Sequence, residues 1–464
     1  MAGTDGGQVR FESDSMGQVE IPGWAYWGAQ TQRAVENFGV SPARIPVPMI
    51  RALGLIKKHA GVVNGRLGLV DSRLTDAIIQ AATEITEGKW DGHYPIDVFQ
   101  TGSGTSWNMN TNEIIANRAN ELLGEPLGTH KPVHPNDHVN RGQSSNDVIP
   151  TAIHIANRVE AEGLLSAVSH LAAALRKKEK EFAGLVKLGR THLQDAVPMT
   201  LGQEFSGYAV QIEKARDRIA ATLPDLEELA LGGTALGTGI NCHPDFPDAV
   251  AEGIAKETNL PFRSAPNKFE AIASRDAQVS LMGALNTLAT SLMKIANDLR
   301  LLASGPRGAL GEIVLPSLQP GSSIMPGKVN PVIPEMVLQV AAYVNGKTVS
   351  VTIAGQNAPL ELNMMNPLIA LETLSSIDIL TNTCRTLADR AITGLEADPE
   401  RLDHWIEWSL ALVTPLATEI GYDAATKLAY KAYKEKRKIR DVVLESGVLP
   451  KEKVTELLDP KRMV

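Results

Sequence analysis

The chain has 464 residues, too many for one compact core, and this length predicts two or three domains. Hydrophobic residues make up 43% and charged residues 21% of it, which is typical of a globular protein and excludes a disordered one. The formal net charge is -8, with acids and bases interleaved, so no basic surface for nucleic acid is expected. The most basic run, "KAYKEKRKIR" at 431–440, alternates with apolar residues, as on a solvated helix face.

Cysteine usage and hydropathy restrict the compartment. Cys242 and Cys384 lie far apart and lack metal-ligand spacing, so neither a disulfide framework nor a zinc site is expected, and a cytoplasmic location fits. The N-terminal segment is polar throughout and predicts no signal peptide. The sequence contains no run of eighteen or more apolar residues, so no membrane span is expected.

The pattern of the sequence changes near residue 150, from segments interrupted by glycine and proline to long segments with helical periodicity. The first part is punctuated by glycine, proline and polar motifs, with a helical pattern from about 48 to 88. Long periodic segments follow at about 151–182, 199–229, 274–304, 335–355 and 365–394. The third carries a heptad seam, with apolar residues spaced alternately four and three apart: Leu281, Leu285, Leu288, Leu292, Ile295, Leu299 and Leu302.

Five such helices predict an all-α fold. Helices of roughly 30 residues span on the order of 45 Å, so they must pack side by side in a bundle. The narrow seams favour helices of other subunits as additional partners, although a single-chain up-down bundle remains open. The expected domains are an N-terminal domain (1–147), a central bundle (148–395) and a small C-terminal helical domain (396–464).

Four polar islands interrupt the helical pattern. They read "TGSGTSWNMN" (101–110), "GQSSND" (142–147), "GRTHLQD" (189–195) and "PGSSIMPGKVNP" (320–331). Any one hydroxyl among them is best explained as a helix cap. Together, four islands of neutral donors beside long helices predict a pocket for a small, polar, anionic ligand.

Two further patterns do not predict a ligand site. "LGGTALGTGIN" at 231–241 lacks the spacing of a phosphate-binding loop and is interpreted as a flexible turn between two long helices. His130, His134 and His138 are spaced four apart, but two prolines break the helical face that a metal site would need. We therefore expect no metal.

With these islands identified, the chain resembles the class II fumarate hydratases of the fumarase/aspartase superfamily. "GSSIMPGKVNP" at 321–331 matches the superfamily signature over its whole length. The other matching blocks occur in order: "TGSGTSWNMN", "HPNDHVN", "GQSSND", "GRTHLQDAVPMTLGQEFSGYA" and "GGTALGTGIN". Aspartate ammonia-lyases, the alternative reading, usually carry Gln at His192, Thr at Ser145 and Ala at Gly327, so the hydratase is favoured.

The resemblance implies a fold, an assembly and a reaction. The fold would be a three-domain one whose five central helices form a 20-helix core in a homotetramer, with each active site shared by three subunits. The reaction would be the reversible anti hydration of fumarate to (S)-malate in the tricarboxylic acid cycle. Neither a cofactor nor a metal is implied, and the partners are the dicarboxylate substrates and further copies of the chain.

The resemblance also assigns residues. Ser322 would be the catalytic base on a loop that Gly321 and Gly327 allow to close, and His192, paired with Glu335, would handle the proton at the departing hydroxyl. The implied substrate-binding residues are Ser103, Gly104, Thr105, Ser144, Ser145, Asn146, Thr191, Ser323, Lys328, Val329 and Asn330. A secondary dicarboxylate site would comprise Lys131, His134, Pro135, Asn136 and Asp137.

The sequence departs from the family pattern at three places. Trp107 is bulky where a small residue is usual, which predicts an altered entrance or subunit contact. Lys131-Pro132 replaces the common Arg-Lys, and "LNMMNP" near 363 predicts a packing change. A non-enzymatic, crystallin-type relative would be expected to have damaged islands, and none of the four is damaged.

Overall fold

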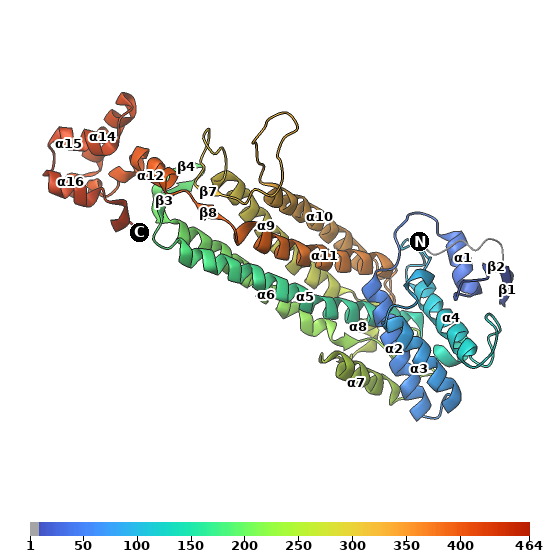
Figure 1. Ribbon diagram of the computed structural model, residues 1–464. Helices are drawn as coiled ribbons and strands as arrows, with labels where there is room; N and C mark the ends of the chain where they lie inside the picture. The colour runs from blue at the N-terminus through green and yellow to red at the C-terminus, as the bar shows by residue number, and fades with distance from the viewer. Residues whose placement is uncertain (1–8) are drawn as a thin grey trace. The chain divides into compact units, whose positions relative to one another are not determined.

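The structure is a computed structural model that describes residues 9–464, so the first eight residues of the polar N-terminal segment lie outside it (Figure 1). Helices dominate, and the described strands form only four two-stranded sheets. The predicted all-α fold is confirmed.

The five predicted long segments are all helices. Their observed bounds are α5 Ser145–Glu181, α6 Leu201–Leu226, α9 Asp276–Leu302, α10 Val332–Gly355 and α11 Asn366–Leu387. A π-helical turn, η3 (Ala388–Ile392), continues α11. Hydrophobic periodicity located these helices because each one buries an apolar stripe.

The heptad seam of α9 is buried inside the protein. Its seven predicted residues are at most 5% exposed. By length and composition, α9 is also the one helix among residues 9–464 that could cross a bilayer. An apolar core helix passes the same test, and the buried seam identifies α9 as such a helix.

Contact density groups the chain into two compact units. The first contains the chain up to Leu165, Asp217–Thr287 and Tyr343–Leu380; the second contains Ser166–Arg216, Leu288–Ala342 and Thr381–Val464. Every long helix contributes a stretch to each unit. The division into domains 1–147, 148–395 and 396–464 stays a prediction.

Within each unit, side-chain contacts join neighbouring long helices. The joining pairs are Asn157–Thr373 (α5–α11) and Lys347–Glu372 (α10–α11) in the first unit, and Arg176–Glu213 (α5–α6) and Tyr208–Asp298 (α6–α9) in the second. Polar pairs, some of them buried, therefore join the long helices in addition to the apolar seams.

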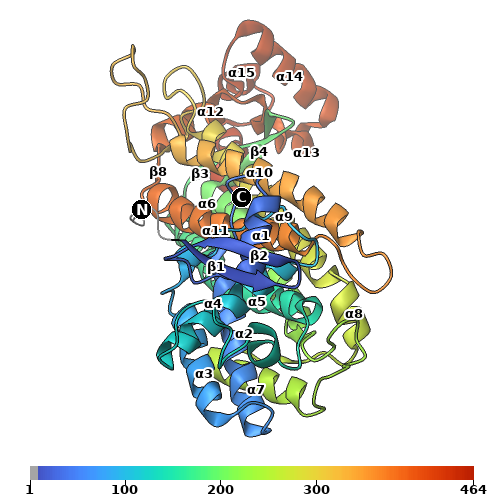
Figure 2. The same ribbon diagram turned by 90° about the vertical axis from the view of Figure 1, so that its right-hand side faces the viewer.

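The remaining elements of the first unit come from two parts of the chain, residues 9–139 and residues 228–273. They are β1 Val9–Asp14, β2 Gly17–Pro22, α1 Ala29–Asn37, α2 Val47–Arg66, α3 Ser72–Thr86, η1 Asp91–His93, α4 Thr105–Leu122, η2 Pro135–Val139, β5 Glu228–Leu229, α7 Phe246–Thr258, β6 Arg263–Ser264 and α8 Lys268–Ala273. Figure 2 shows β1 and β2 paired beside α1. The buried Glu113 of α4 accepts the N–H groups of Gly28, Gln30 and Thr31 and so caps α1.

The second unit adds a hairpin and a C-terminal group of short helices. They are β3 Val186–Thr191, β4 Gln194–Thr200, β7 Ile313–Val314, β8 Glu396–Ala397, α12 Pro399–Trp408, η4 Leu410–Val413, α13 Leu416–Ile420, α14 Tyr422–Glu435, α15 Ile439–Ser446, α16 Lys451–Leu457 and η5 Pro460–Arg462. The helices after residue 399 share a core that includes Leu412, Leu416 and Val443. The predicted C-terminal helical group is present.

Candidate active site

The first island ends earlier than expected, because Gly104 stops the loop. Gly104 has a φ of 75°, and α4 begins immediately after it at Thr105. A Cβ on Gly104 would lie 2.9 Å from Ile149 Cγ2, so only glycine fits both the space and the conformation. The Ser103 and Thr105 hydroxyls lie 2.8 Å apart at this helix start.

Trp107 belongs to the core of the first unit. Its side chain is 0% exposed and lies within the main hydrophobic cluster of that unit. The prediction that Trp107 alters an entrance or a subunit contact is therefore wrong, because its side chain is buried within the described chain. A residue in the first turn of a helix can face inward as well as outward, and the sequence did not reveal which face Trp107 occupies.

The second island is the N-terminus of α5. Ser144 Oγ accepts the N–H of Asn146 (3.2 Å), and Asp147 Oδ1 accepts the N–H of Ser144 (2.8 Å), which is a reciprocal capping arrangement. The capping interpretation therefore holds for Ser144. Ser145 Oγ accepts a hydrogen bond from Asn108 Nδ2 at 3.0 Å.

The glycine-rich stretch 231–241 folds onto this helix start. Asp147 Oδ2 accepts the N–H groups of Gly232 and Thr234, each at 2.9 Å, and Asn146 Nδ2 donates to Ala235 O at 2.7 Å. The short helices α7 and α8 follow before α9, so the stretch does not join two long helices directly. Proline at the start of α7 and Asn259 at its end set off a helix that the sequence analysis missed.

The third island is the tip of the β3–β4 hairpin. His192 (φ 55°) and Leu193 (φ 59°) occupy the two turn positions. A two-residue turn of this kind needs positive φ at both positions, normally supplied by Asn and Gly. A bulky residue with positive φ costs about 1–2 kcal/mol, and such strain concentrates at functional sites. Thr191 and His192 are exposed at this tip.

The fourth island is an irregular loop that holds Ser322. Ser322 Oγ accepts the backbone N–H groups of Ile324 (3.2 Å) and Met325 (3.0 Å). Two converging N–H donors would stabilise negative charge on this oxygen. The neighbouring candidates Ser323, Lys328 and Val329 are exposed on the same loop.

Backbone contacts close the base of this loop. Gly321 N donates to Lys328 O (2.8 Å), and Asn330 Nδ2 donates to Gly321 O (2.7 Å). The loop borders an open hollow of about 420 Å³ lined by residues that include Ser322 and Lys328. Ser322, Met325 and Lys328 therefore line one hollow.

Glu335 lies in the first turn of α10, just after this loop. Within the described second unit, no hydrogen bond or ion pair joins Glu335 to His192, and neither is bonded to Ser322. The pairing of His192 with Glu335 stays a prediction that one chain alone does not fulfil.

The residues implied for the secondary dicarboxylate site surround the short turn η2. His134 Nδ1 accepts the N–H groups of Asn136 and Asp137, each at 3.2 Å, so this ring caps the turn. Lys131, Asn136 and Asp137 are exposed, whereas Pro135 is buried. Among residues 9–464, no group of three or more His, Cys, Asp or Glu side chains could hold a metal ion.

A buried polar group behind the second island was missed by the sequence analysis. Lys57 of α2 is 0% exposed, and its Nζ donates to Asn140 Oδ1 (3.0 Å) and Gln143 Oε1 (2.9 Å). A signal existed, because Lys57 shares its helix face with the buried Leu53 and Ala60.

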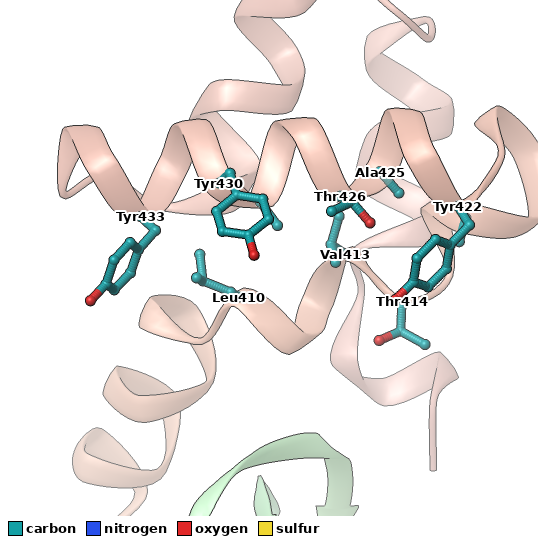
Figure 3. Close-up of a pocket in the computed structure, with 10 residues that line it drawn as sticks. Leu410, Val413, Thr414, Tyr422, Ala425, Thr426, Tyr430 and Tyr433 are labelled. Carbon is teal, nitrogen blue, oxygen red and sulfur yellow. The ribbon is translucent and has the colours of Figure 1, made fainter.

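A second hollow, among the C-terminal helices, does not involve the islands. It measures about 550 Å³ and is lined by Tyr422, Tyr430 and Tyr433 of α14, with Tyr422 beside Thr414 and Tyr430 nearest Leu410 (Figure 3). Its lining contains no charged group and no predicted site residue. It therefore lacks a cation to balance the charge of a small dianion.

The base of the Ser322 loop can be tested by adding one methyl group. In Gly321→Ala, the new Cβ would lie 2.5 Å from Lys328 O and 2.8 Å from Asn330 N, so the loop base must open. We expect several-fold faster trypsin cleavage after Lys328, measured by mass spectrometry of the fragments. Gly308→Ala is the control, since its Cβ would meet no atom within 4 Å. Equal cleavage in both variants would show that the closed base does not order the loop.

Comparisons with known proteins identify the family. Residues 17–346 match the family model described as "Lyase", and residues 412–464 match the one described as "Fumarase C C-terminus". A class II fumarate hydratase of Neisseria meningitidis is 51% identical over 457 residues, covering 98% of this chain and 99% of the relative. The mitochondrial fumarate hydratase of Rattus norvegicus is 50% identical over 458 residues, covering 98% of this chain and 90% of the relative.

The fold agrees with the sequence match. The crystal structure of a class II fumarase from Schistosoma mansoni superposes with a TM-score of 0.95 at 41% identity, covering 98% of this chain and 99% of that one. Both the fold and the ordered motifs extend over nearly the whole chain. The chain therefore belongs to the class II fumarate hydratase family of lyases.

Proposed function

We propose that this lyase catalyses the reversible anti addition of water to fumarate, giving (S)-malate. The observation that carries the proposal is the position of Ser322 Oγ between the N–H groups of Ile324 and Met325. In the malate direction a base must remove a proton from a carbon beside a carboxylate. A serine hydroxyl is too weak for this unless its alkoxide is stabilised, and two backbone donors supply that stabilisation.

The charge that develops on the substrate needs its own donors. Removal of the proton leaves a dianionic aci-carboxylate, which an ammonium and neutral donors can stabilise. Lys328 is exposed on the Ser322 loop, so its ammonium group can reach the aci-carboxylate of a bound substrate. Asn330 Nδ2 uses one N–H to hold Gly321 O, and its second N–H is left for substrate.

Neutral donors on the other islands would complete the dicarboxylate site. Their hydroxyls and amides lie at the starts of α4 and α5 and at the β3–β4 hairpin tip, where N–H groups also favour anions. The proposed residues on these islands are Ser103, Gly104, Thr105, Ser144, Ser145, Asn146 and Thr191, and the Ser322 loop itself adds Ser323 and Val329. Their neutrality suits a substrate that carries its own two charges.

His192 and Glu335 would manage the proton at the departing hydroxyl. A carboxylate next to a histidine fixes the ring tautomer and raises its basicity. The strained hairpin tip projects His192 into solvent, which suits a group that must meet a partner from outside its own unit. His192 also favours the hydratase over an aspartate ammonia-lyase, in which this position is usually Gln.

We infer a homotetramer with a 20-helix core and active sites shared by three subunits. Two observations support this assembly. His192 and Glu335 make no bond to each other within the described chain, and α10 leaves the large apolar side chains Tyr343, Val349 and Ile353 more than half exposed. Such side chains on a bundle helix are typical of a subunit interface.

The cellular setting follows from the reaction. Interconversion of fumarate and malate places the enzyme in the tricarboxylic acid cycle. Both cysteines are free, which fits the reducing cytoplasm, although the rat relative is named as mitochondrial.

A secondary dicarboxylate site at Lys131, His134, Pro135, Asn136 and Asp137 is also proposed, with His134 held in place by its capping bonds.

The reaction can be tested by following absorbance at 240 nm. Fumarate should appear rapidly from L-malate and not from L-aspartate, and Ser322→Ala should lower kcat by about 10³-fold because it removes the base. Size-exclusion chromatography checks that the variant keeps its assembly. Faster turnover of aspartate would assign the chain to the ammonia-lyases, and normal turnover by Ser322→Ala would remove Ser322 from the mechanism.

The shared sites can be tested by mixing two inactive variants. Ser322→Ala and His192→Asn are refolded together in equal amounts, and hybrid tetramers are verified by native mass spectrometry. If the two residues of one site come from different chains, about a quarter of sites receive both intact residues, so about a quarter of wild-type activity should return.

The matched control mixes Ser322→Ala with Lys328→Met. These residues lie on the same loop of the same chain, so no combination yields an intact loop and no activity should return. Failure of the first mixture to regain activity despite hybrid formation would place Ser322 and His192 of each site on one chain.

A further inference from the structure

Lys57 places a buried positive charge directly behind the second island. Its side chain is 0% exposed, and both of its hydrogen-bond acceptors, Asn140 Oδ1 and Gln143 Oε1, are neutral amides. A buried ammonium is costly unless its hydrogen bonds are satisfied. These acceptors precede Ser144 in sequence, so the charge is connected to the segment that leads into the proposed substrate-binding turn.

Two amide side chains, Asn140 and Asn108, connect Lys57 to Ser145, and the hydrogen bonds fix the orientation of each amide. An ammonium can only donate, so Asn140 must turn its oxygen towards Lys57. That same oxygen accepts from the Nδ2 atoms of Asn108 and Asn112, each at 3.2 Å. Asn108 Nδ2 also donates to Ser145 Oγ at 3.0 Å. Asn140 Nδ2 donates to Gln143 O (3.1 Å), which supports the same orientation.

This polarity determines what the Ser145 hydroxyl can do. Its oxygen already accepts from Asn108, so its hydrogen remains to donate to another group. A hydroxyl fixed as a donor suits a carboxylate ligand, which can only accept. The opposite polarity would make Ser145 donate to Asn108 and would turn a lone pair towards the anion.

Asp147 provides the counter-charge on the far side of the turn. Its buried carboxylate accepts three backbone N–H groups, from Ser144, Gly232 and Thr234. Burial raises the pKa of Asp147 to about 6 and lowers the pKa of Lys57 to about 7, while their mutual attraction opposes both shifts. The buried side chains of Lys57 and Asp147 thus both bond to the segment from Asn140 to Ser144.

We propose that Lys57 is a positioning residue for dicarboxylate binding, acting through Asn140 and Asn108 to hold the Ser145 hydroxyl as a hydrogen-bond donor to the substrate. The inference rests on the proposed function, since it names a further residue of the same site. Lys57 itself touches no substrate. Its contribution is made before substrate arrives, so it should affect binding more than the chemical step.

The test compares Lys57→Met with Lys57→Arg. Lys57→Met removes the ammonium at similar volume, and we expect KM for fumarate to rise about tenfold with kcat within about threefold, because uniform binding is lost. Lys57→Arg keeps the charge and the donors and should recover most of the affinity. Calorimetry with succinate, a saturated four-carbon dicarboxylate, measures the same loss as a Kd without requiring turnover.

Asn108→Asp tests the same contacts without touching the lysine. It keeps the shape of the side chain but offers Ser145 an acceptor in place of a donor, so its Kd for succinate should rise as in Lys57→Met. If circular dichroism shows that Lys57→Met does not fold, the Kd of Asn108→Asp for succinate tests whether these contacts contribute to dicarboxylate binding.

Asn64→Leu is the matched control on the same helix. Asn64 is 1% exposed and donates to Arg141 O at 3.1 Å, so it supports the same segment without contacting Asn140, Asn108 or Ser145. It should lower Tm and leave the Kd for succinate unchanged. Folded Lys57→Met or Asn108→Asp with wild-type Kd and KM would overturn the inference. Wild-type enzyme that binds succinate but does not hydrate fumarate would overturn the proposed function and leave the inference to be judged by Kd.

Discussion

The proposed chemistry depends on one interaction, the acceptance of two backbone N–H groups by Ser322 Oγ. Carbon is a poor proton donor, and an unassisted serine is a poor base, so the loop must present N–H groups to the serine oxygen. The interior of a helix cannot do this, because its N–H groups bond to carbonyl groups of the preceding turn, so a helix start or an irregular loop is needed. The loop therefore interrupts a helical chain, and Gly321 allows its two ends to approach closely.

The other islands combine structural and chemical roles. Ser144 caps α5 with its own hydroxyl, while Ser145 accepts from Asn108 and keeps its hydrogen available. The capping interpretation and the binding interpretation therefore apply to different hydroxyls of one turn. In the same way, the β3–β4 hairpin has a structural role as a connection, yet its tip holds His192 in a backbone conformation that its residue type disfavours.

Hydrophobic periodicity predicted the bundle because each long helix has a buried stripe, as the seam from Leu281 to Leu302 shows. Other features could not be read from the sequence. The β3–β4 turn lacks the Asn-Gly pair that marks such hairpins, so it was taken for a loop. The prediction for Trp107 was wrong because the burial of a side chain depends on contacts with distant segments of the chain. The candidate residues came from the motif resemblance, and their convergence in one site stays a prediction.

The most direct measurement replaces the Met325 amide by an ester, which removes the N–H donor to Ser322 Oγ and leaves every side chain intact. The account predicts a fall in kcat for malate of about 10²-fold, typical of losing one donor to a developing oxyanion, with the assembly and the Kd for succinate unchanged. A kcat within twofold of the unmodified enzyme would contradict it, since the hydroxyl of Ser322 would then need no such stabilisation.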